Sequence, residues 1–234
     1  PILNKAVCLD NGTILAPASL QGKPGKRIHI ERSTDGGKTW EKMGLEATQH
    51  IARIVVHPTN PDVVYVAAQG ALYGPTKERG IYRSTDGGKT WKNILFVNDL
   101  TGGVELSMVW NTPEVLYAAL WHHQRKPWEL ISGGEGSGLY KSTDGGESWQ
   151  LLENGLPEEK GKMAIAVSQT NPDKFYALIE SDSKKDLGGL FVSDNAGVSW
   201  KRISDDNRLT QRAWYYTEVF IDPTNEHVVY VLSA

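Results

Sequence analysis

Short runs in which apolar and polar residues alternate recur along the chain, and residues that favour turns separate them. Residues 51–56 (IARIVV) and 63–68 (VVYVAA) flank a turn built from proline and asparagine, and the same strand–turn–strand unit recurs around residues 106–120, 164–179 and 218–232. A two-residue period rich in β-branched and aromatic residues is typical of β-strands. The first three units are each followed by a third run (GIYRS, GLYKS or GLFVS) and by a fourth that begins at a tryptophan. The pattern therefore predicts an all-β protein with four antiparallel strands in each repeat.

One eight-residue phrase marks the turn between the third and fourth predicted strands. It reads STDGGKTW at residues 33–40 and 84–91, STDGGESW at residues 142–149 and SDNAGVSW at residues 193–200, so the copies begin 51, 58 and 51 residues apart. This period is that of a propeller blade. We expect the aspartate to accept backbone N–H groups, the glycines to adopt positive φ and the tryptophan to be buried between neighbouring sheets. The structural residues of the phrase are then Asp35, Trp40, Asp86, Trp91, Asp144, Trp149, Asn195 and Trp200.

The phrase resembles the Asp-box, or bacterial neuraminidase repeat. Residues 32–234 resemble the sortilin-type, glycosyl-hydrolase-like Asp-box β-propellers, and residues 4–19 (NKAVCLDNGTILAPAS) are similar to the opening blade of sialidase-like enzymes. The resemblance implies a β-propeller whose boxes lie on the face opposite the ligand site, and an extracellular or periplasmic location. Asp-boxes occur in sialidases, xyloglucanases, sortilin-like receptors and photosystem assembly factors, so the resemblance leaves the activity open.

The repeats predict how the chain divides into blades. We expect one β-propeller domain, or a fragment of one, over residues 1–234, with blades near residues 4–43, 50–95, 103–153 and 162–203 and a half blade at residues 214–232. About four and a half blades do not make an ordinary closed ring. The chain is therefore either a piece of a longer propeller, which we favour, or it pairs its open edges with another chain such as a second copy.

Composition and charge argue against several kinds of partner. The formal net charge is −3 and the charged residues, 23% of the chain, are interspersed by sign, so nucleic-acid binding is not expected. No apolar run reaches the roughly 20 residues that span a bilayer, so membrane insertion is not expected either. The boxes lack the earlier glycine of a phosphate loop and the carboxylates of a calcium loop, so we expect no cofactor and no metal. The single cysteine, Cys8, lies in an alternating apolar stretch and is expected to be buried.

Three insertions are expected as loops on the face opposite the boxes. Aromatic faces stack on sugar rings or side chains, and arginine binds carboxylates, so these loops are the candidate contact surface. The longest follows Leu120 and offers Trp121, His122, Arg125 and Trp128; the second, QRAWYY, offers Arg212, Trp214, Tyr215 and Tyr216; the third offers Tyr73, Lys77, Glu78 and Arg79. The alternative for Trp121 and Trp128 is that they only clamp the loop onto the next blade. A metal pair at His122 and His123 is disfavoured, because adjacent residues on an extended chain point in opposite directions.

Two further expectations concern the propeller axis. Arg53 and Glu105 fall in or beside inner strands, where they either form a satisfied ion pair or contact a ligand. Tyr215 and Tyr216 are adjacent, so one is expected to face the funnel and the other to pack between blades.

Two functions fit these residues. The first is a ligand-binding propeller that recognises a glycan or a peptide without chemistry, through Trp121, His122, Arg125, Trp128, Arg212, Trp214, Tyr215, Arg53 and Glu105. The second is a glycoside hydrolase of the sialidase-like or xyloglucanase-like type. A sialidase needs an arginine cluster, a tyrosine nucleophile with a glutamate and an aspartate acid/base; Arg53, Arg125, Arg212, Tyr216 and Glu218 fill some of these places, and no aspartate is evident. A xyloglucanase-like enzyme needs two carboxylates about 5 to 10 Å apart across the funnel, and the sequence identifies no such pair. Whether the segment is an enzyme stays open, and binding is the favoured prediction.

Overall fold

The computed structural model describes residues 6–9, 11–22, 25–181 and 187–233, and almost every regular element within them is a strand. The first sheet contains β1 (Val7–Cys8), β2 (Ile14–Gly22), β3 (Gly25–Ser33) and β4 (Glu41–Lys42). The second contains β5 (Ile51–Val56), β6 (Val64–Ala68), β7 (Gly80–Ser84) and β8 (Lys92–Leu95). The third contains β9 (Thr101–Met108), β10 (Leu116–Lys126), β11 (Glu129–Ser132), β12 (Gly138–Ser142) and β13 (Gln150–Leu152).

The last two sheets complete the described chain. One contains β14 (Met163–Val167), β15 (Phe175–Ile179), β16 (Gly189–Ser193) and β17 (Lys201–Ser204), and the other contains only β18 (Glu218–Ile221) and β19 (Val229–Leu232). In the residues that the structure describes, the helical elements are two single turns, Glu46–Thr48 and Asn207–Leu209. Within the described ranges, no helix has the length and apolar character needed to cross a membrane.

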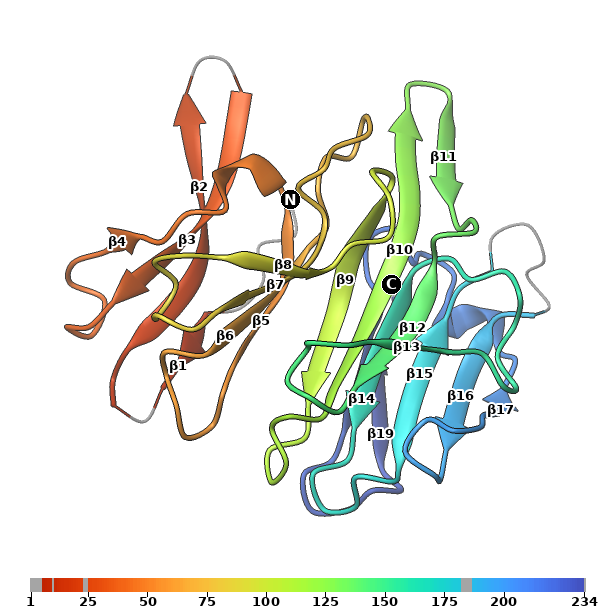
Figure 1. The fold of residues 1–234 in the computed structure, drawn as a ribbon. Helices are drawn as coiled ribbons and strands as arrows, with labels where there is room; N and C mark the ends of the chain where they lie inside the picture. Colours follow the sequence, from red (N-terminus) through yellow and green to blue (C-terminus); the bar gives the residue numbers. More distant parts are fainter. Residues whose placement is uncertain (1–5, 10, 23–24, 182–186, 234) are drawn as a thin grey trace.

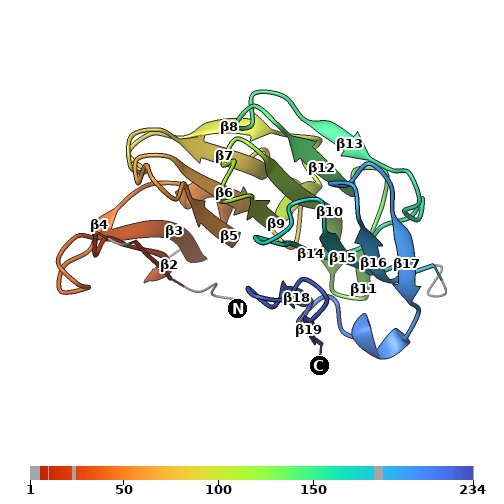
Figure 2. The same cartoon turned by 90° about the horizontal axis from the view of Figure 1, so that it is seen from below.

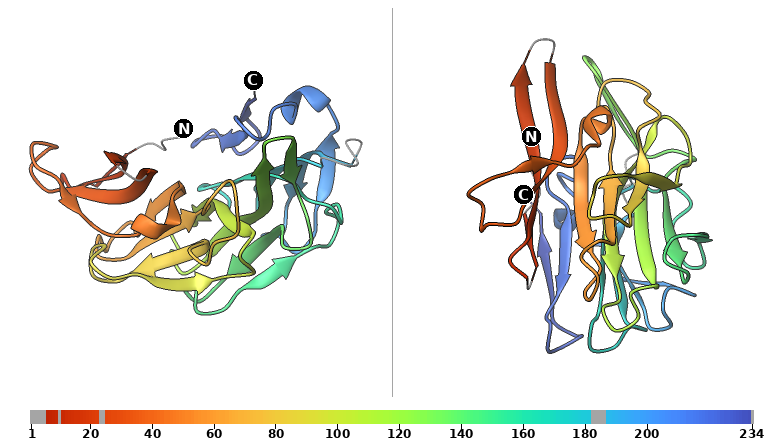
Figure 3. Two further views of the ribbon diagram at one scale, coloured as in Figure 1. Left: turned by 90° about the horizontal axis from the view of Figure 1, so that it is seen from above. Right: turned by 60° about the vertical axis from the view of Figure 1, so that its left-hand side comes forward.

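The sheets fan around a common centre, as in a propeller. Figure 2 shows β5, β9, β14 and β18 on the inside of the fan, with β8, β13 and β17 on the outside (Figure 2). Figure 3 shows that the sheets follow an arc with β2 and β3 at one end and β18 and β19 at the other (Figure 3). The predicted all-β propeller with four-stranded antiparallel blades is therefore confirmed.

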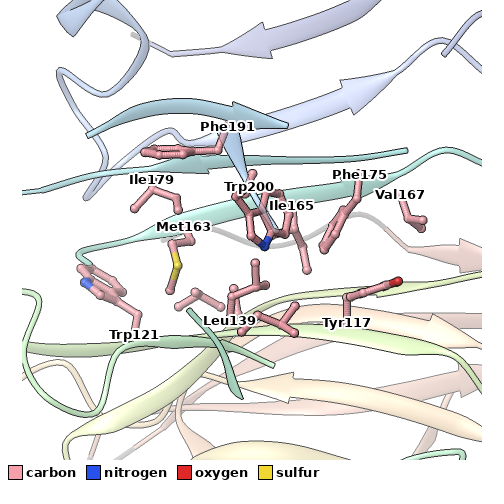
Figure 4. Close-up of a cluster of buried hydrophobic side chains, with 14 of the residues drawn as sticks. Tyr117, Trp121, Leu139, Met163, Ile165, Val167, Phe175, Ile179, Phe191 and Trp200 are labelled. Atoms are coloured by element: carbon pink, nitrogen blue, oxygen red, sulfur yellow. The ribbon is translucent and has the colours of Figure 1, made fainter. Parts of the chain in front are cut away.

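Burial on both faces of the second strand of each blade explains why the blades stack. In β6, Val64 and Val66 pack toward the first blade, whereas Tyr65 and Ala67 pack toward the third. The two-residue period of a strand sends successive side chains to opposite faces, so one strand supplies two cores. Figure 4 shows the core between the third and fourth blades, where Tyr117, Trp121 and Leu139 meet Met163, Phe175 and Trp200 (Figure 4). Each pair of consecutive blades is held by such an apolar cluster. Burial of apolar surface is the main favourable contribution to the free energy of folding.

The Asp-box turns have the hydrogen bonds that their sequence predicts. In the first box, Asp35 Oδ1 accepts from the backbone N of Lys38 and Thr39 at 3.0 and 2.9 Å, and Gly36 and Gly37 have φ of 73° and 87°. Hydrogen bonds from Thr39 and Ser33 lower the pKa of Asp35 to about 2. The turn is thus locked by an ionised carboxylate that replaces missing ladder partners.

The fourth box keeps this geometry with an amide. Asn195 Oδ1 accepts from Ser193 Oγ at 2.8 Å and from the backbone N of Ser199 at 2.9 Å. Its Nδ2 donates to Ser199 Oγ at 2.8 Å. In the other boxes the hydroxyl at this position is instead the donor, and the aspartate carboxylate accepts from it. Ala196 has a φ of 54°, so a side chain occupies a position where the other boxes use glycine.

The box tryptophans are buried or half-buried where the structure describes a preceding blade. Trp200 is 7% exposed and packs on Phe175, and Trp91 is half-buried and donates from Nε1 to the Met43 carbonyl of the first blade at 2.6 Å. Trp149 is half-buried against the second blade. The prediction was wrong for Trp40, which is 43% exposed because the described residues place no sheet before the first blade. It was also wrong for Cys8, whose exposed side chain points away from the core that Val7 joins.

Candidate functional site

Four inner strands bring one repeat position to the propeller axis. The last residues of β5, β9 and β18 each pair with the first residue of the next strand, so they mark equivalent positions in the blades. Arg53, Glu105 and Glu218 each lie three residues before that last residue. Ala164 holds this position in the fourth blade. Because these residues share one level of the propeller, side chains that are up to 165 positions apart in sequence meet at its centre.

Arg53 joins two carboxylates at the axis. Its Nε and Nη2 donate to the two oxygens of Glu105 at 2.5 and 2.6 Å, and Nη2 also donates to Glu218 Oε2 at 3.4 Å. Glu105 additionally accepts from the backbone N of Leu106 at 3.0 Å. The ion pair that the sequence offered as one alternative for Arg53 and Glu105 is therefore present.

Burial and attraction act in opposite directions on these groups. Burial lowers the pKa of Arg53, but attraction to Glu105 and Glu218 outweighs it and raises the pKa above its usual range. Burial raises the pKa of Glu105, and Arg53 opposes that rise. The Glu105 side chain is 6% exposed and the Glu218 side chain is 33% exposed, so Glu218 is the more accessible of the two carboxylates.

A small polar cavity of about 30 Å³ opens beside this ion pair. We call Arg53, Glu105, Lys162 and Glu218 the axial cluster; all four line the cavity, together with Thr217 and Gln69. Lys162 directly precedes β14, and its ammonium lies 5.8 Å from the centre of the Trp121 ring. Burial lowers the pKa of Lys162, and the nearby Glu180, Glu105 and Glu218 oppose that decrease.

The segment after Leu120 is a strand and hairpin, and its prediction as a loop was wrong. β10 continues to Lys126 and pairs with β11, because the alternation of Tyr117, Ala119 and Trp121 carries the strand beyond the blade. Trp121 is 1% exposed and donates from Nε1 to Ser132 Oγ at 3.0 Å. It therefore packs in the core between blades, as the clamping alternative expects.

Aromatic neighbours complete that packing. The Trp121 and His123 rings stack at 4.3 Å, and the half-buried Trp214 meets Trp121 edge-on at 4.7 Å. Burial, followed by the charge of Arg79, lowers the pKa of His123 to about 3. The half-buried His122 packs its ring against Gly134, and burial lowers its pKa. These side chains hold the base of the hairpin.

Buried Arg79 fixes the neighbouring loop, residues 69–79. Its guanidinium donates to the carbonyls of Gln69, Leu100, Ala71 and Gly74 at 2.5 to 3.1 Å. The loop is tied to the hairpin, because the backbone N of Arg125 donates to the Leu72 carbonyl at 2.7 Å. Arg79, which the sequence offered as a surface residue, is thus a structural one.

Other predicted contact residues do lie at the surface. Trp128, in the hairpin turn, is 81% exposed, and Tyr73, in the loop that Arg79 fixes, is 72% exposed. Arg212 is exposed and Arg125 is half-buried, and neither lines the axial cavity. Tyr215 and Tyr216 are both exposed because their backbone N atoms donate to the Arg212 carbonyl and form a turn, so the expectation that one of them packs between blades was wrong.

Trp128 and the Asp-box of the third blade lie at opposite ends of that blade. In the third blade the box backbone bonds to the turn before β10, through Gly145 N and the Glu114 carbonyl at 2.9 Å. The β10–β11 hairpin extends from the other end of β10, as Figure 1 shows (Figure 1). This agrees with the face that the Asp-box resemblance implies for a ligand.

Sequence reasoning missed Lys162, Thr217 and Gln69 as cavity residues. A signal existed for the axial position itself, because aligning the repeats by their turns puts Arg53, Glu105 and Glu218 in one column. No comparable signal marks Lys162, since it lies in a connection whose length differs between repeats.

Comparisons with known proteins agree with this architecture. Residues 28–157 match the family model Sortilin-Vps10, described as sortilin, neurotensin receptor 3. A xyloglucanase from a Paenibacillus species is 27% identical over 183 residues, which cover 77% of this chain and 15% of the relative. The chain therefore spans less than a fifth of that relative's length.

Solved structures show the same fold. A GH74 xyloglucanase from Xanthomonas campestris superposes with a TM-score of 0.69 at 16% identity, covering 99% of this chain and 35% of that one. A Hadza microbial sialidase superposes with a TM-score of 0.54 at 15% identity, covering 93% of this chain and 49% of that one.

Proposed function

Because the chain belongs to the Sortilin-Vps10 family and has a xyloglucanase among its relatives, we propose that it is a glycan-binding segment of a propeller glycoside hydrolase. In this proposal the axial cluster receives one sugar of an oligosaccharide, and exposed aromatic residues such as Trp128 and Tyr73 bind other sugars of the same oligosaccharide. Carbohydrate sites commonly combine carboxylate acceptors and cationic donors for hydroxyl groups with aromatic faces for the sugar ring.

The observation that carries the proposal is the convergence at the axis. Glu218 presents a partly exposed carboxylate into a cavity that Lys162 and Arg53 also line. This cavity lies among residues from four blades, at the level where the inner strands meet. A sugar hydroxyl placed there can donate to Glu218 and accept from Lys162.

The same geometry argues that this segment binds without turnover. Glycoside hydrolysis requires two carboxyl groups, one as acid and one as base or nucleophile. Both oxygens of Glu105 are held by Arg53, and Glu105 and Glu218 are the two carboxylates that line the cavity. In the part of the chain that the structure describes, Glu218 is therefore the one open carboxylate of this cavity, and a second would have to come from elsewhere in a longer enzyme.

A sialidase-type role is less well supported. Such a site needs arginines that are free to bind a substrate carboxylate, and the Arg53 guanidinium is already held by Glu105 and Glu218. Arg125 and Arg212 do not line the same cavity.

The test is binding of the purified chain to xyloglucan oligosaccharides, measured by titration calorimetry, with reducing-sugar release measured in parallel. We expect binding without release of reducing ends. Glu218→Gln should weaken binding about tenfold or more, because a hydrogen bond to a charged group contributes roughly 1.5 to 3 kcal/mol. Binding of peptides with no binding of any glycan would overturn the proposal. Release of reducing ends by this chain alone would refute the claim that it binds glycan without hydrolysing it.

A further inference from the structure

Lys162 has an ammonium group for which the described residues supply no hydrogen-bonding partner. Within the described residues its Nζ makes no hydrogen bond and no close ion pair, and its one ring contact is with Trp121 at 5.8 Å. The backbone of Lys162 is fixed, because its N donates to Glu180 Oε2 at 3.0 Å and its carbonyl accepts from the Glu180 N at 3.0 Å. The side chain is half-buried and lines the axial cavity. A positively charged donor is thus held at the cavity, and no acceptor among the described residues uses its hydrogens.

Other charged groups at or near the cavity already form hydrogen bonds within the protein. Arg53 uses Nε and Nη2 on Glu105, and Nη2 also reaches Glu218 at 3.4 Å. The nearby Glu180 lies outside the cavity lining, and its Oε2 accepts from Ser132 Oγ at 2.5 Å. Lys162 as donor and Glu218 as acceptor therefore remain open to a ligand, and Nη1 of Arg53, for which the described residues supply no acceptor, is a second open donor of the axial cluster.

The cavity also limits what can enter. Its volume of about 30 Å³ accommodates one or two water molecules, or a group of similar size. A sugar ring would have to stay outside and insert a single hydroxyl or hydroxymethyl group.

Charge decides between a neutral group and an anionic one. The axial cluster contains two cations and two carboxylates, so it is close to neutral overall. A carboxylate entering it would gain Lys162 but would lie beside Glu218 and Glu105, and like charges repel strongly where water is excluded. An uncharged hydroxyl, in contrast, can accept from Lys162 and donate to Glu218 at the same time.

We propose that Lys162 and Glu218 form a donor and acceptor pair that takes one hydroxyl-bearing group of a neutral sugar. In this pair Lys162 holds the hydroxyl oxygen, and the charge of Glu218 sets the preference for a neutral group over an anionic one. The inference rests on the proposed glycan binding and deepens it by naming the class of sugar. It distinguishes neutral oligosaccharides from uronic-acid oligosaccharides of the same linkage.

The experiment compares two matched probes on the intact chain. Cellohexaose carries hydroxymethyl groups, and its C6-oxidised counterpart carries carboxylates on the same β-1,4 backbone. We expect the wild-type chain to bind the neutral probe at least tenfold more tightly in titration calorimetry at low salt. Lys162→Met should weaken binding of the neutral probe about tenfold or more, since hydrogen bonds to charged groups are among the stronger ones.

Two further variants separate specificity from folding. Lys201→Met removes an exposed lysine of the outer strand β17 and should leave both affinities unchanged. Glu218→Gln should lower the preference for the neutral probe, because it removes one repelling charge while it keeps the size of the side chain. Melting temperatures of all variants report whether the fold is intact.

The outcomes are distinguishable. If the chain binds both probes equally, or prefers the oxidised probe, the inference is overturned while glycan binding stands. If Lys162→Met keeps its melting temperature and binds the neutral probe as the wild type does, Lys162 does not hold the hydroxyl and the inference is overturned. If Lys162→Met does not fold, the change in preference on Glu218→Gln decides, and an unchanged preference overturns the inference. If neither cellohexaose nor xyloglucan oligosaccharides bind, the proposed function fails and the inference fails with it.

Discussion

Replacing Arg53 with methionine tests whether the axial ion pair is held together by charge compensation. The change keeps most of the side-chain volume but removes both hydrogen bonds to the Glu105 oxygens. Glu105, with 6% of its side chain exposed, would keep, among the described residues, the one bond from the Leu106 backbone at 3.0 Å. Breaking a buried pair by removing one partner costs about 3 to 5 kcal/mol, because the remaining charge loses its compensation. For a chain of 234 residues this corresponds to a decrease in melting temperature of roughly 6 to 20 °C.

The assay is urea unfolding between pH 5 and pH 8. Burial already raises the pKa of Glu105, and the loss of Arg53, which opposes that rise, should raise it further. An acid whose pKa is higher in the folded than in the unfolded state binds its proton more tightly when the protein is folded. Above the unfolded pKa of about 4.3, stability therefore falls as the pH rises through the folded pKa. The loss caused by Arg53→Met should be larger at pH 8 than at pH 5.

The double variant Arg53→Met, Glu105→Leu is the control. Replacing both charges by apolar groups of similar volume is often close to neutral, so the double variant should be more stable than the single one. The reasoning would be refuted if Arg53→Met lost less than about 1 kcal/mol at pH 8, or if its loss did not depend on pH.

Three other predictions follow from the blades and their boxes. Trp200→Ala should cost about 3 to 5 kcal/mol in urea unfolding, whereas Trp40→Ala, at a 43% exposed position, should cost much less; equal losses would contradict the packing described for the two indoles. Hydrogen bonds from Ser148 and Ser142 lower the pKa of Asp144, so its stabilisation is present above pH 4 and is lost as the pH falls; Asp144→Asn, which copies the turn at Asn195, should be less stable than the wild type at pH 7, and a gap in melting temperature that stays constant down to pH 2.5 would count against this. Trp128→Ala should weaken binding of xyloglucan oligosaccharides and leave the melting temperature unchanged, since the side chain is 81% exposed; a fall in melting temperature without loss of binding would indicate packing instead.

Much of the blade architecture could be predicted because its signals are local. The boxes combine a carboxylate, positive-φ positions and hydroxyl donors within a few residues, so Asp35 and its counterparts form the same turn wherever the phrase occurs. The alternation in β6 likewise requires two apolar faces. The same alternation through Tyr117, Ala119 and Trp121 was a signal for a longer strand, and the cationic residues that follow it led to the prediction of a loop.

The candidate site was harder to predict because it depends on distant residues. Arg53, Glu105 and Glu218 are separated by whole blades, and whether each is paired or open depends on where the others lie. Exposure of the aromatic residues was equally undetermined, since Trp121 and Trp128 lie seven residues apart in the same predicted loop but are 1% and 81% exposed. Burial is a property of the surroundings, which the local sequence does not contain.

The sequence by itself determined the strands, the Asp-box turns and the repeat that stacks them, because each rests on contacts between residues close together along the chain. Only the tertiary structure decided that Glu105 is held by Arg53, that Glu218 and Lys162 remain open at the axis, and that Trp40 is 43% exposed. These outcomes depend on which side chains of separate blades come within hydrogen-bonding or packing distance. Those distances join residues far apart in sequence, so they are set by the tertiary structure and not by the local sequence.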